Sequence, residues 1–99
     1  MNLDQRIAIV TGAGSGIGAA TAEALAAAGA SVVVTDISEK AAEQTANVIA
    51  QRGQSATALV QDVTSPEQWE QVFEAARATF GAPNALVNNA GVSGAGQDR

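Results

Sequence analysis

Apolar residues in this chain alternate between short compact runs and longer stretches with helical spacing. Four compact runs lie at residues 6–10, 32–34, 56–60 and 85–87. They are too short for helices, and Ile and Val dominate the first two, as is typical of buried strands. Because the third run alternates more between apolar and small residues, we expect it at an edge of the sheet. The pattern predicts four strands separated by three helices.

Each stretch between the strands also carries helix boundary signals. Ser65-Pro66-Glu67-Gln68 combines a hydroxyl cap, a proline in the first turn and a glutamine three residues after the serine. Glycine is the usual residue just past a helix. The predicted helices run from Ile17 to Gly29, from Ser38 to Gly53 and from Ser65 to Gly81. Their predicted inner faces are Ile17, Ala20, Thr21, Ala24, Leu25 and Ala28, then Ala41, Ala42, Thr45, Val48 and Ile49, and finally Trp69, Val72, Phe73, Ala76 and Phe80.

The alternation of strands and helices determines the expected fold class. Successive strands joined through a helix pair in parallel by right-handed crossovers, which place helices on both faces of the sheet. We therefore expect an α/β fold with a doubly wound parallel sheet, the element order β-α-β-α-β-α-β and the strand order 3-2-1-4. Residues 1–92 form this unit, and residues 93–99 form a glycine-rich polar tail.

Composition narrows the classes of function. The chain has 99 residues, enough for one domain, and 23 of its apolar residues are alanine, so the predicted core is thin. Five scattered basic residues and a net charge of −5 argue against a nucleic-acid partner. Without cysteine or histidine there is no basis for disulfides, Ser-His-Asp hydrolysis or a typical zinc site, and we predict no metal. No apolar run has transmembrane length, so we expect a cytoplasmic protein.

A glycine-rich segment, Thr11 to Gly18, connects the first strand to the first helix. Glycine permits positive φ in a tight turn, close approach of a phosphate to the backbone and close packing of helix on sheet. Amide groups at the start of the helix then face the phosphate. A P-loop is excluded because no Gly-Lys-Ser/Thr follows. A flexible connection without a ligand is the structural alternative.

Asp36 follows the second strand, 18 residues after Gly18. A carboxylate at this place accepts hydrogen bonds from the ribose hydroxyls of an adenine dinucleotide and repels a 2′-phosphate. Ser15 and Ile37 stand where a basic residue would be needed to hold that phosphate. The sequence therefore favours NAD over NADP. Asp36 could alternatively be an ordinary turn residue.

Two motifs together resemble the classical short-chain dehydrogenase/reductase family. The spacing Thr-Gly-x-x-x-Gly-x-Gly is followed, after the fourth strand, by Asn88-Asn89-Ala90-Gly91. The resemblance covers Leu3 through Val92 and implies a Rossmann-type half-domain that binds NAD(P). It implies the cofactor contacts Gly12, Ser15, Gly16, Ile17, Gly18, Asp36, Ile37, Asp62, Val63, Asn89, Ala90 and Gly91. Asn88 would be structural, and Asp62 is equally explained as a turn residue before Ser65.

The family's catalytic residues have no counterpart in this chain. The family uses a tyrosine with a lysine four residues later, whereas this sequence has no tyrosine and its single lysine is Lys40. We therefore predict no catalytic residue, an inactive isolated chain and a small-molecule substrate only in a longer parent. A non-catalytic nucleotide-binding or assembly module, or a decayed gene fragment, is the alternative. A sugar-nucleotide epimerase is disfavoured because such enzymes carry a different glycine spacing.

The fourth predicted strand of this chain is apolar and lies at an edge of the predicted sheet. Such an edge predicts that the chain associates with itself.

Overall fold

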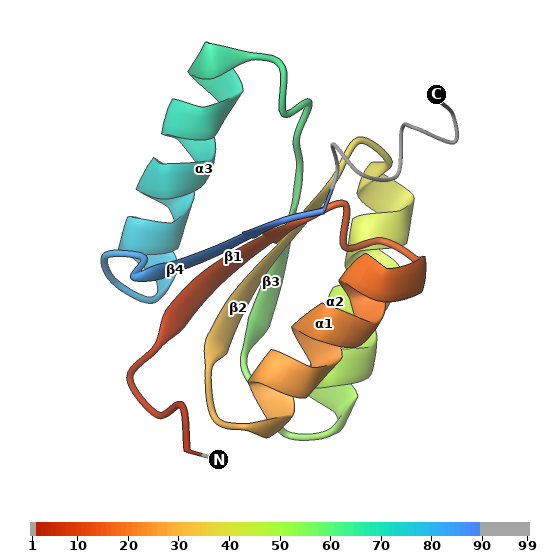
Figure 1. Ribbon diagram of the computed structural model, residues 1–99, viewed down its shortest axis with the longest axis vertical. Coiled ribbons are helices and arrows are strands. Elements are labelled where there is room, and N and C mark those ends of the chain that lie inside the picture. The colour runs from red at the N-terminus through yellow and green to blue at the C-terminus, as the bar shows by residue number, and fades with distance from the viewer. Residues whose placement is uncertain (1, 90–99) are drawn as a thin grey trace.

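The computed structural model describes residues 2–89, in which strands and helices alternate as the sequence predicts (Figure 1). The elements are β1 (Ile7–Thr11), α1 (Gly16–Ala27), β2 (Ser31–Asp36), α2 (Glu39–Gln51), β3 (Ala56–Val60), α3 (Pro66–Thr79) and β4 (Ala85–Asn88). Strand boundaries differ from the predicted ones by at most two residues, because strands extend beyond their apolar cores. The residues predicted to form the tail, 93–99, lie outside the described part, as do Ala90 and Gly91.

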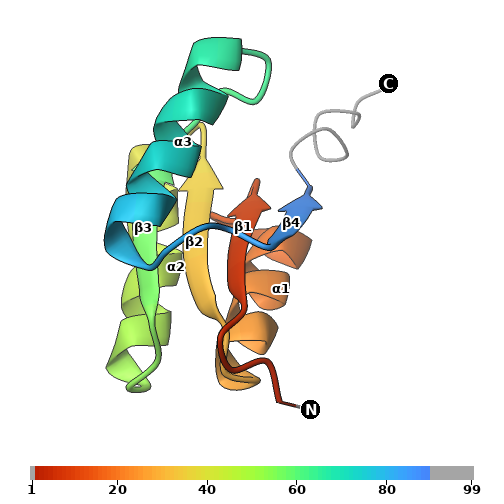
Figure 2. The ribbon, with the colours of Figure 1, turned by 90° about the vertical axis from the view of Figure 1, so that its left-hand side faces the viewer.

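The four strands form one parallel sheet in the order β3-β2-β1-β4, which confirms the predicted topology. Helices α1 and α2 cover one face and α3 lies on the other (Figures 1 and 2). Because all strands run in the same direction, their carboxyl ends meet at one edge of the sheet. Thr11, Asp36 and Asn88 end β1, β2 and β4 there. This edge is where ligands of open α/β sheets bind.

The core lies in two layers, one on each face of the sheet. On the face covered by α1 and α2, Val10, Val32, Val34 and Ile49 pack among buried alanines. On the face covered by α3 the buried cluster is smaller and consists of Ile9, Val33, Val72 and Ala76. Small side chains bring the helices close to the sheet but bury little apolar area per residue. More than half of the buried apolar residues are alanine, in keeping with the composition of the chain.

The predicted inner face of α1 is largely wrong, although Leu25 is partly buried and packs against the core as predicted. Its buried residues are Gly18, Ala22 and Ala26, whereas Ala20 and Ala24 are exposed and the Ile17 side chain is 77% exposed. Alanine occurs on every side of this helix, so apolar spacing does not distinguish one face from another. Gly18 lies on the buried face, close to the Gly12 carbonyl of the preceding turn.

The predicted faces of α2 and α3 are correct in part. In α2, Ala42, Thr45 and Ile49 are buried as expected. Ala46 is also buried, whereas Val48, which was predicted to face inward, is exposed. In α3 the fully buried residues are Val72 and Ala76. Phe73, Trp69 and Phe80 are only partly covered, and the rings of Trp69 and Phe73 lie 6.0 Å apart. A single helix on this face leaves part of each large side chain in solvent.

The serine caps that the sequence predicts are present at the starts of α2 and α3. The Ser38 hydroxyl accepts a hydrogen bond from the Ala41 amide, and the Ser65 hydroxyl accepts one from the Gln68 amide. The Gln68 side chain reaches further back than in a standard capping box, to the Asp62 amide at 2.7 Å. The glycines that follow the helices have positive φ, as expected for Gly29, Gly53 and Gly81. No helix within residues 2–89 is long and apolar enough to cross a membrane.

Candidate functional site

The glycines after β1 and in the first turn of α1 have distinct roles. Gly12 and Gly16 both have a φ of +60°, a conformation that other residues adopt only under strain. A Cβ on Gly18 would lie 2.0 Å from the Gly12 carbonyl oxygen, so only glycine fits at the first turn of α1. A Cβ on Gly16 would meet no atom within 4 Å. Gly16 therefore leaves open space beside the backbone at the start of α1.

The start of α1 differs from the starts of the other two helices. Ser15 is its N-cap but forms no side-chain cap, and its first turn holds no acidic residue. In α2 and α3 a serine hydroxyl caps the helix, and Glu39 or Glu67 lies in the first turn. Unmatched amide groups and the positive end of the helix dipole attract an anion. Among the described helices, α1 is the one whose start has backbone amides available to bind a phosphate group.

The Asp36 carboxylate is held in place by two backbone amides. The Gly14 amide donates to Oδ2 at 2.9 Å, and the Ser38 amide donates to Oδ1 at 3.0 Å. The Asp36 carbonyl oxygen also accepts a hydrogen bond from the Gln61 amide, and the Ala13 amide donates to the Thr35 carbonyl. The bonds from Gly14 and Ala13 join the glycine-rich turn to the end of β2. Asp36 is therefore more than an ordinary turn residue, because its side chain bridges two segments.

Thr11 connects the ends of β1 and β4. Its fully buried hydroxyl donates to Asn88 Oδ1 at 2.8 Å and accepts from the Asn89 amide at 3.0 Å. These bonds agree with a structural role for Asn88. The Asn89 side-chain nitrogen, Nδ2, is buried and has no hydrogen-bond partner within residues 2–89. A buried donor without a partner is costly, which makes Asn89 a candidate for contact with a ligand.

These groups converge on a cleft of about 320 Å³ at the carboxyl edge of the sheet. Its lining residues are Gly12, Ser15, Gly16, Ile17, Gly18, Asp36 and Asn89, all of them predicted from the sequence. No lysine or arginine is among them. Thr11 and Gly14 were missed by the sequence analysis as site residues. Their only signal was membership of the glycine-rich segment, because the bonds they form join residues distant in sequence.

Three further predicted residues, Ile37, Asp62 and Val63, do not line this cleft. Ile37 is 73% exposed. Asp62 Oδ1 accepts hydrogen bonds from the Thr64 hydroxyl and the Thr64 amide, and these bonds, the hydroxyl's first, lower the pKa of its carboxyl below its usual range. The Val63 carbonyl accepts a bond from the Trp69 indole nitrogen. Asp62 thus has the turn role that the sequence left open, and its contact with adenine stays a prediction.

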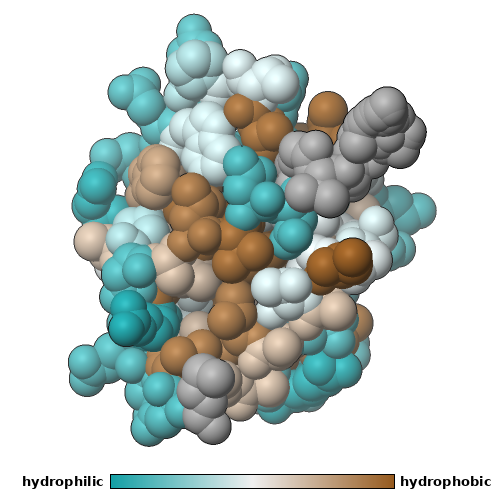
Figure 3. Space-filling model, viewed as in Figure 1, coloured by the Kyte–Doolittle hydropathy of each residue, from teal (hydrophilic) through white to brown (hydrophobic). Residues whose placement is uncertain are grey.

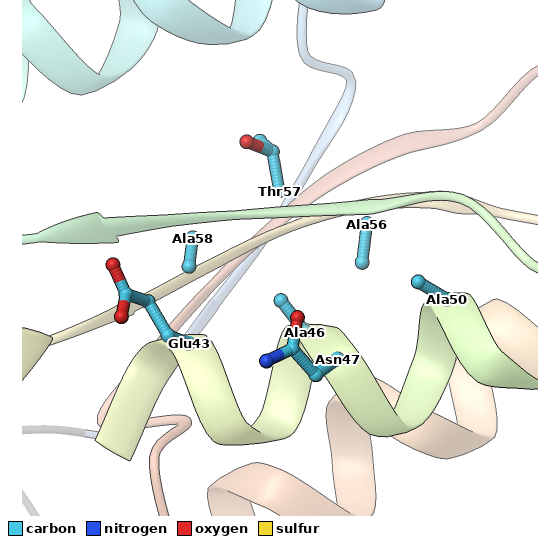
Figure 4. A pocket seen from close by; sticks show the side chains of 7 residues that line it. All are labelled: Glu43, Ala46, Asn47, Ala50, Ala56, Thr57 and Ala58. Carbon is cyan, nitrogen blue, oxygen red and sulfur yellow. The ribbon is translucent and has the colours of Figure 1, made fainter. Parts of the chain in front are cut away.

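A separate groove of about 400 Å³ lies between α2 and β3 (Figure 4). Alanines form most of its wall, Glu43 and Asn47 supply its polar groups from α2, and Thr57 points away from that helix. None of the predicted site residues lines it. Within residues 2–89, no group of three or more acidic residues could hold a metal ion. The chemistry of the described residues is therefore concentrated at the glycine-rich cleft.

Comparison with known proteins agrees with this geometry. The sequence model of the short chain dehydrogenase family matches residues 6–99. The chain belongs to this family. It is 45% identical over 93 residues to the 3-oxoacyl-[acyl-carrier-protein] reductase FabG of Escherichia coli, and 43% identical over 91 residues to a cyclohexanol dehydrogenase of Acinetobacter sp.. These alignments cover 94% and 92% of this chain.

A solved short chain dehydrogenase shows the same arrangement in three dimensions. It is a 7α-hydroxysteroid dehydrogenase in complex with NADH and 7-oxo glycochenodeoxycholic acid, with a TM-score of 0.85 and 42% sequence identity over 88% of this chain. The match spans 34% of that protein, and the two sequence relatives are matched over 37% and 36% of their lengths. The chain thus spans about a third of the length of these relatives.

Proposed function

We propose that this chain is the dinucleotide-binding portion of an oxidoreductase that transfers hydride between NAD and an alcohol or carbonyl substrate. The observation that carries the proposal is the convergence of three features on one cleft. They are the uncapped start of α1, the bridged carboxylate of Asp36 and the buried side-chain nitrogen of Asn89, which has no hydrogen-bond partner within residues 2–89. The start of α1 suits the pyrophosphate of a dinucleotide, and Asp36 suits the adenosine ribose. Asn89 suits the ribose on the nicotinamide side.

Each cleft residue has a binding role in this proposal. The pyrophosphate would meet backbone amides and open space at the start of α1, provided by Gly12, Ser15, Gly16, Ile17 and Gly18. Asp36 accepts bonds from the adenosine ribose, with Ile37 beside it, and Asn89 contacts the nicotinamide side together with Ala90 and Gly91. Asp62 and Val63 would contact adenine. The nicotinamide of the bound cofactor supplies the hydride chemistry, and the residues of this chain bind and orient it.

Charge in the cleft favours NAD over NADP. Asp36 lines the cleft with its carboxylate, and none of the lining residues within 2–89 is basic. A 2′-phosphate would meet that carboxylate without a compensating cation, whereas ribose hydroxyls can donate hydrogen bonds to it. The complex of a similar dehydrogenase with NADH supports a nicotinamide dinucleotide but does not bear on this preference.

Titration calorimetry of the purified chain with NAD and with NADP tests the proposal. We expect a measurable heat with NAD and weaker binding of NADP. Replacement of Asp36 by Asn, which keeps the size of the side chain and removes its charge, should reduce the difference between the two cofactors by about tenfold or more. Failure of the wild-type chain to bind either cofactor would overturn the proposal.

The second candidate is a nucleotide-binding or assembly module without chemistry. Both candidates require the same cleft, so cofactor binding does not separate them. The reading frame downstream of Arg99 does. A serine followed by Tyr-x-x-x-Lys in frame supports an enzyme whose substrate is a small molecule, whereas a stop codon supports the module or a decayed gene. The differing names of the relatives leave the substrate class open, and a cytoplasmic location stays a proposal from composition.

The outer edge of β4 is the proposed surface for self-association. Within the described sheet, β4 pairs with β1 alone, and the Leu86 side chain is 51% exposed. In Figure 3 hydrophobic residues, coloured brown, gather in the middle of the visible face, and Figure 1 shows β4 at that place in the same view. Unpaired backbone groups beside apolar side chains favour pairing with another chain. The isolated 99-residue chain should therefore associate with itself.

A further inference from the structure

Gly14 stands out because the structure gives it a contact that the cofactor site does not explain. Its amide belongs to the glycine-rich turn but is directed at Asp36 Oδ2, 2.9 Å away, across 22 residues of sequence. The Gly14 amide therefore binds the Asp36 carboxylate of the protein itself and not a phosphate. Its φ lies outside the left-handed region, so its backbone conformation does not require glycine.

Space requires glycine at this position instead. A Cβ on Gly14 would lie 2.5 Å from the Cβ of Ala41 and 2.8 Å from Asp36 Oδ2. Real Cβ atoms do not approach other atoms so closely, so a side chain here must displace the first turn of α2, the carboxylate or both. Ala41 also donates its amide to the Ser38 cap, so the same turn supports the second amide that holds Asp36.

From this packing we infer that Gly14 is a positioning residue that sets the cofactor preference by fixing the Asp36 carboxylate. The inference rests on the proposed function and deepens it. One oxygen is held from the glycine-rich turn and the other from the start of α2, so the carboxylate is oriented before any ligand arrives. A carboxylate that is already oriented can accept hydrogen bonds from the ribose hydroxyls. The same fixed charge repels a 2′-phosphate at that position. A displaced carboxylate loses both effects.

Replacement of Gly14 by Ala tests this role through the ratio of the dissociation constants of NADP and NAD. The ratio should fall by about tenfold, the value of one hydrogen bond to a charged group. The loss should depend on Asp36. In an Asp36→Asn background, where the charge is already absent, Gly14→Ala should change the ratio by less than about twofold. A purely structural role would weaken binding of both cofactors equally and leave the ratio unchanged.

A double variant keeps the test valid if Gly14→Ala folds poorly. Adding Ala41→Gly removes the helix atom that is nearest to the new Cβ but not the contact with Asp36 Oδ2. The double variant should therefore regain thermal stability, measured by circular dichroism, while its cofactor preference remains relaxed.

The outcomes separate the two proposals. If the wild-type chain prefers NAD and the variants keep that preference, the inference about Gly14 is overturned while the proposed function stands. An equal fall of the ratio in the Asp36→Asn background would also overturn it, because Gly14 would then act through another group. Equal affinity of the wild-type chain for both cofactors overturns the preference and the inference but retains dinucleotide binding. Binding of neither cofactor overturns everything, the proposed function included.

Discussion

Glycine has two different physical functions in the segment from the end of β1 to the first turn of α1. Gly12 and Gly16 are required for their backbone conformation, with φ at +60°, whereas Gly14 and Gly18 are required because a Cβ would collide with neighbouring atoms. Sequence spacing identified the turn and three of these positions, but it did not show which reason applies to which glycine. That distinction determines how each position responds to substitution.

Gly16 and Gly53 form a matched pair for testing the phosphate site. Both have positive φ, and a Cβ on either meets no atom within 4 Å, but only Gly16 lines the cleft. Replacement of either by Ala should lower the free energy of unfolding by about 1 kcal/mol through backbone strain, measured by urea denaturation. Only Gly16→Ala should weaken NAD binding, by about tenfold in calorimetry, because its Cβ enters the space left for the pyrophosphate. Equal NAD affinities of the two variants would contradict this assignment.

At the scale of secondary structure, the helices are better determined at their ends than on their faces. Serine caps and terminal glycines were predicted from local sequence, and the structure contains them at Ser38, Ser65 and the three helix ends. Buried faces depend on what each helix packs against. In alanine-rich α1 the sequence is almost the same on all sides, so the face could not be predicted.

The three N-cap serines should differ in their contribution to stability. Ser38→Ala and Ser65→Ala should each lower the free energy of unfolding by about 1 kcal/mol, because each removes a hydrogen bond to a first-turn amide. Ser15→Ala is the control, since Ser15 forms no side-chain cap, and its cost should be a few tenths of a kcal/mol. Denaturation without cofactor measures all three. A loss at Ser15 as large as at Ser65 would show that α1 is capped like the other helices.

At the scale of the whole molecule, the parallel sheet brings the site together. The bonded pairs Gly14–Asp36 and Thr11–Asn89 are separated by 22 and 78 residues, and they meet because every strand ends at the same edge. The same sheet has two outer strands within the described residues. β3 is one and β4, with exposed Leu86, is the other.

Replacing Leu86 by Lys should shift the 99-residue chain toward the monomer in analytical ultracentrifugation. The substitution removes an apolar side chain from the β4 surface and adds a charge, which opposes edge pairing. Val60→Lys is the matched control, because Val60 is 50% exposed at the end of β3 on the opposite edge. We expect Val60→Lys to associate like the wild-type chain. A monomeric wild-type chain would rule out association through β4.

The sequence by itself determined the alternation of strands and helices, the helix ends, the fold class and the residues that line the cleft. These properties follow from local spacing, from capping and turn chemistry, and from motifs that resemble a known family. Only the tertiary structure decided the buried face of α1, the turn role of Asp62 and the bridges made by Gly14 and Thr11. Burial and long-range hydrogen bonds depend on which atoms the folded sheet brings within a few ångströms, and local sequence does not encode that distance directly.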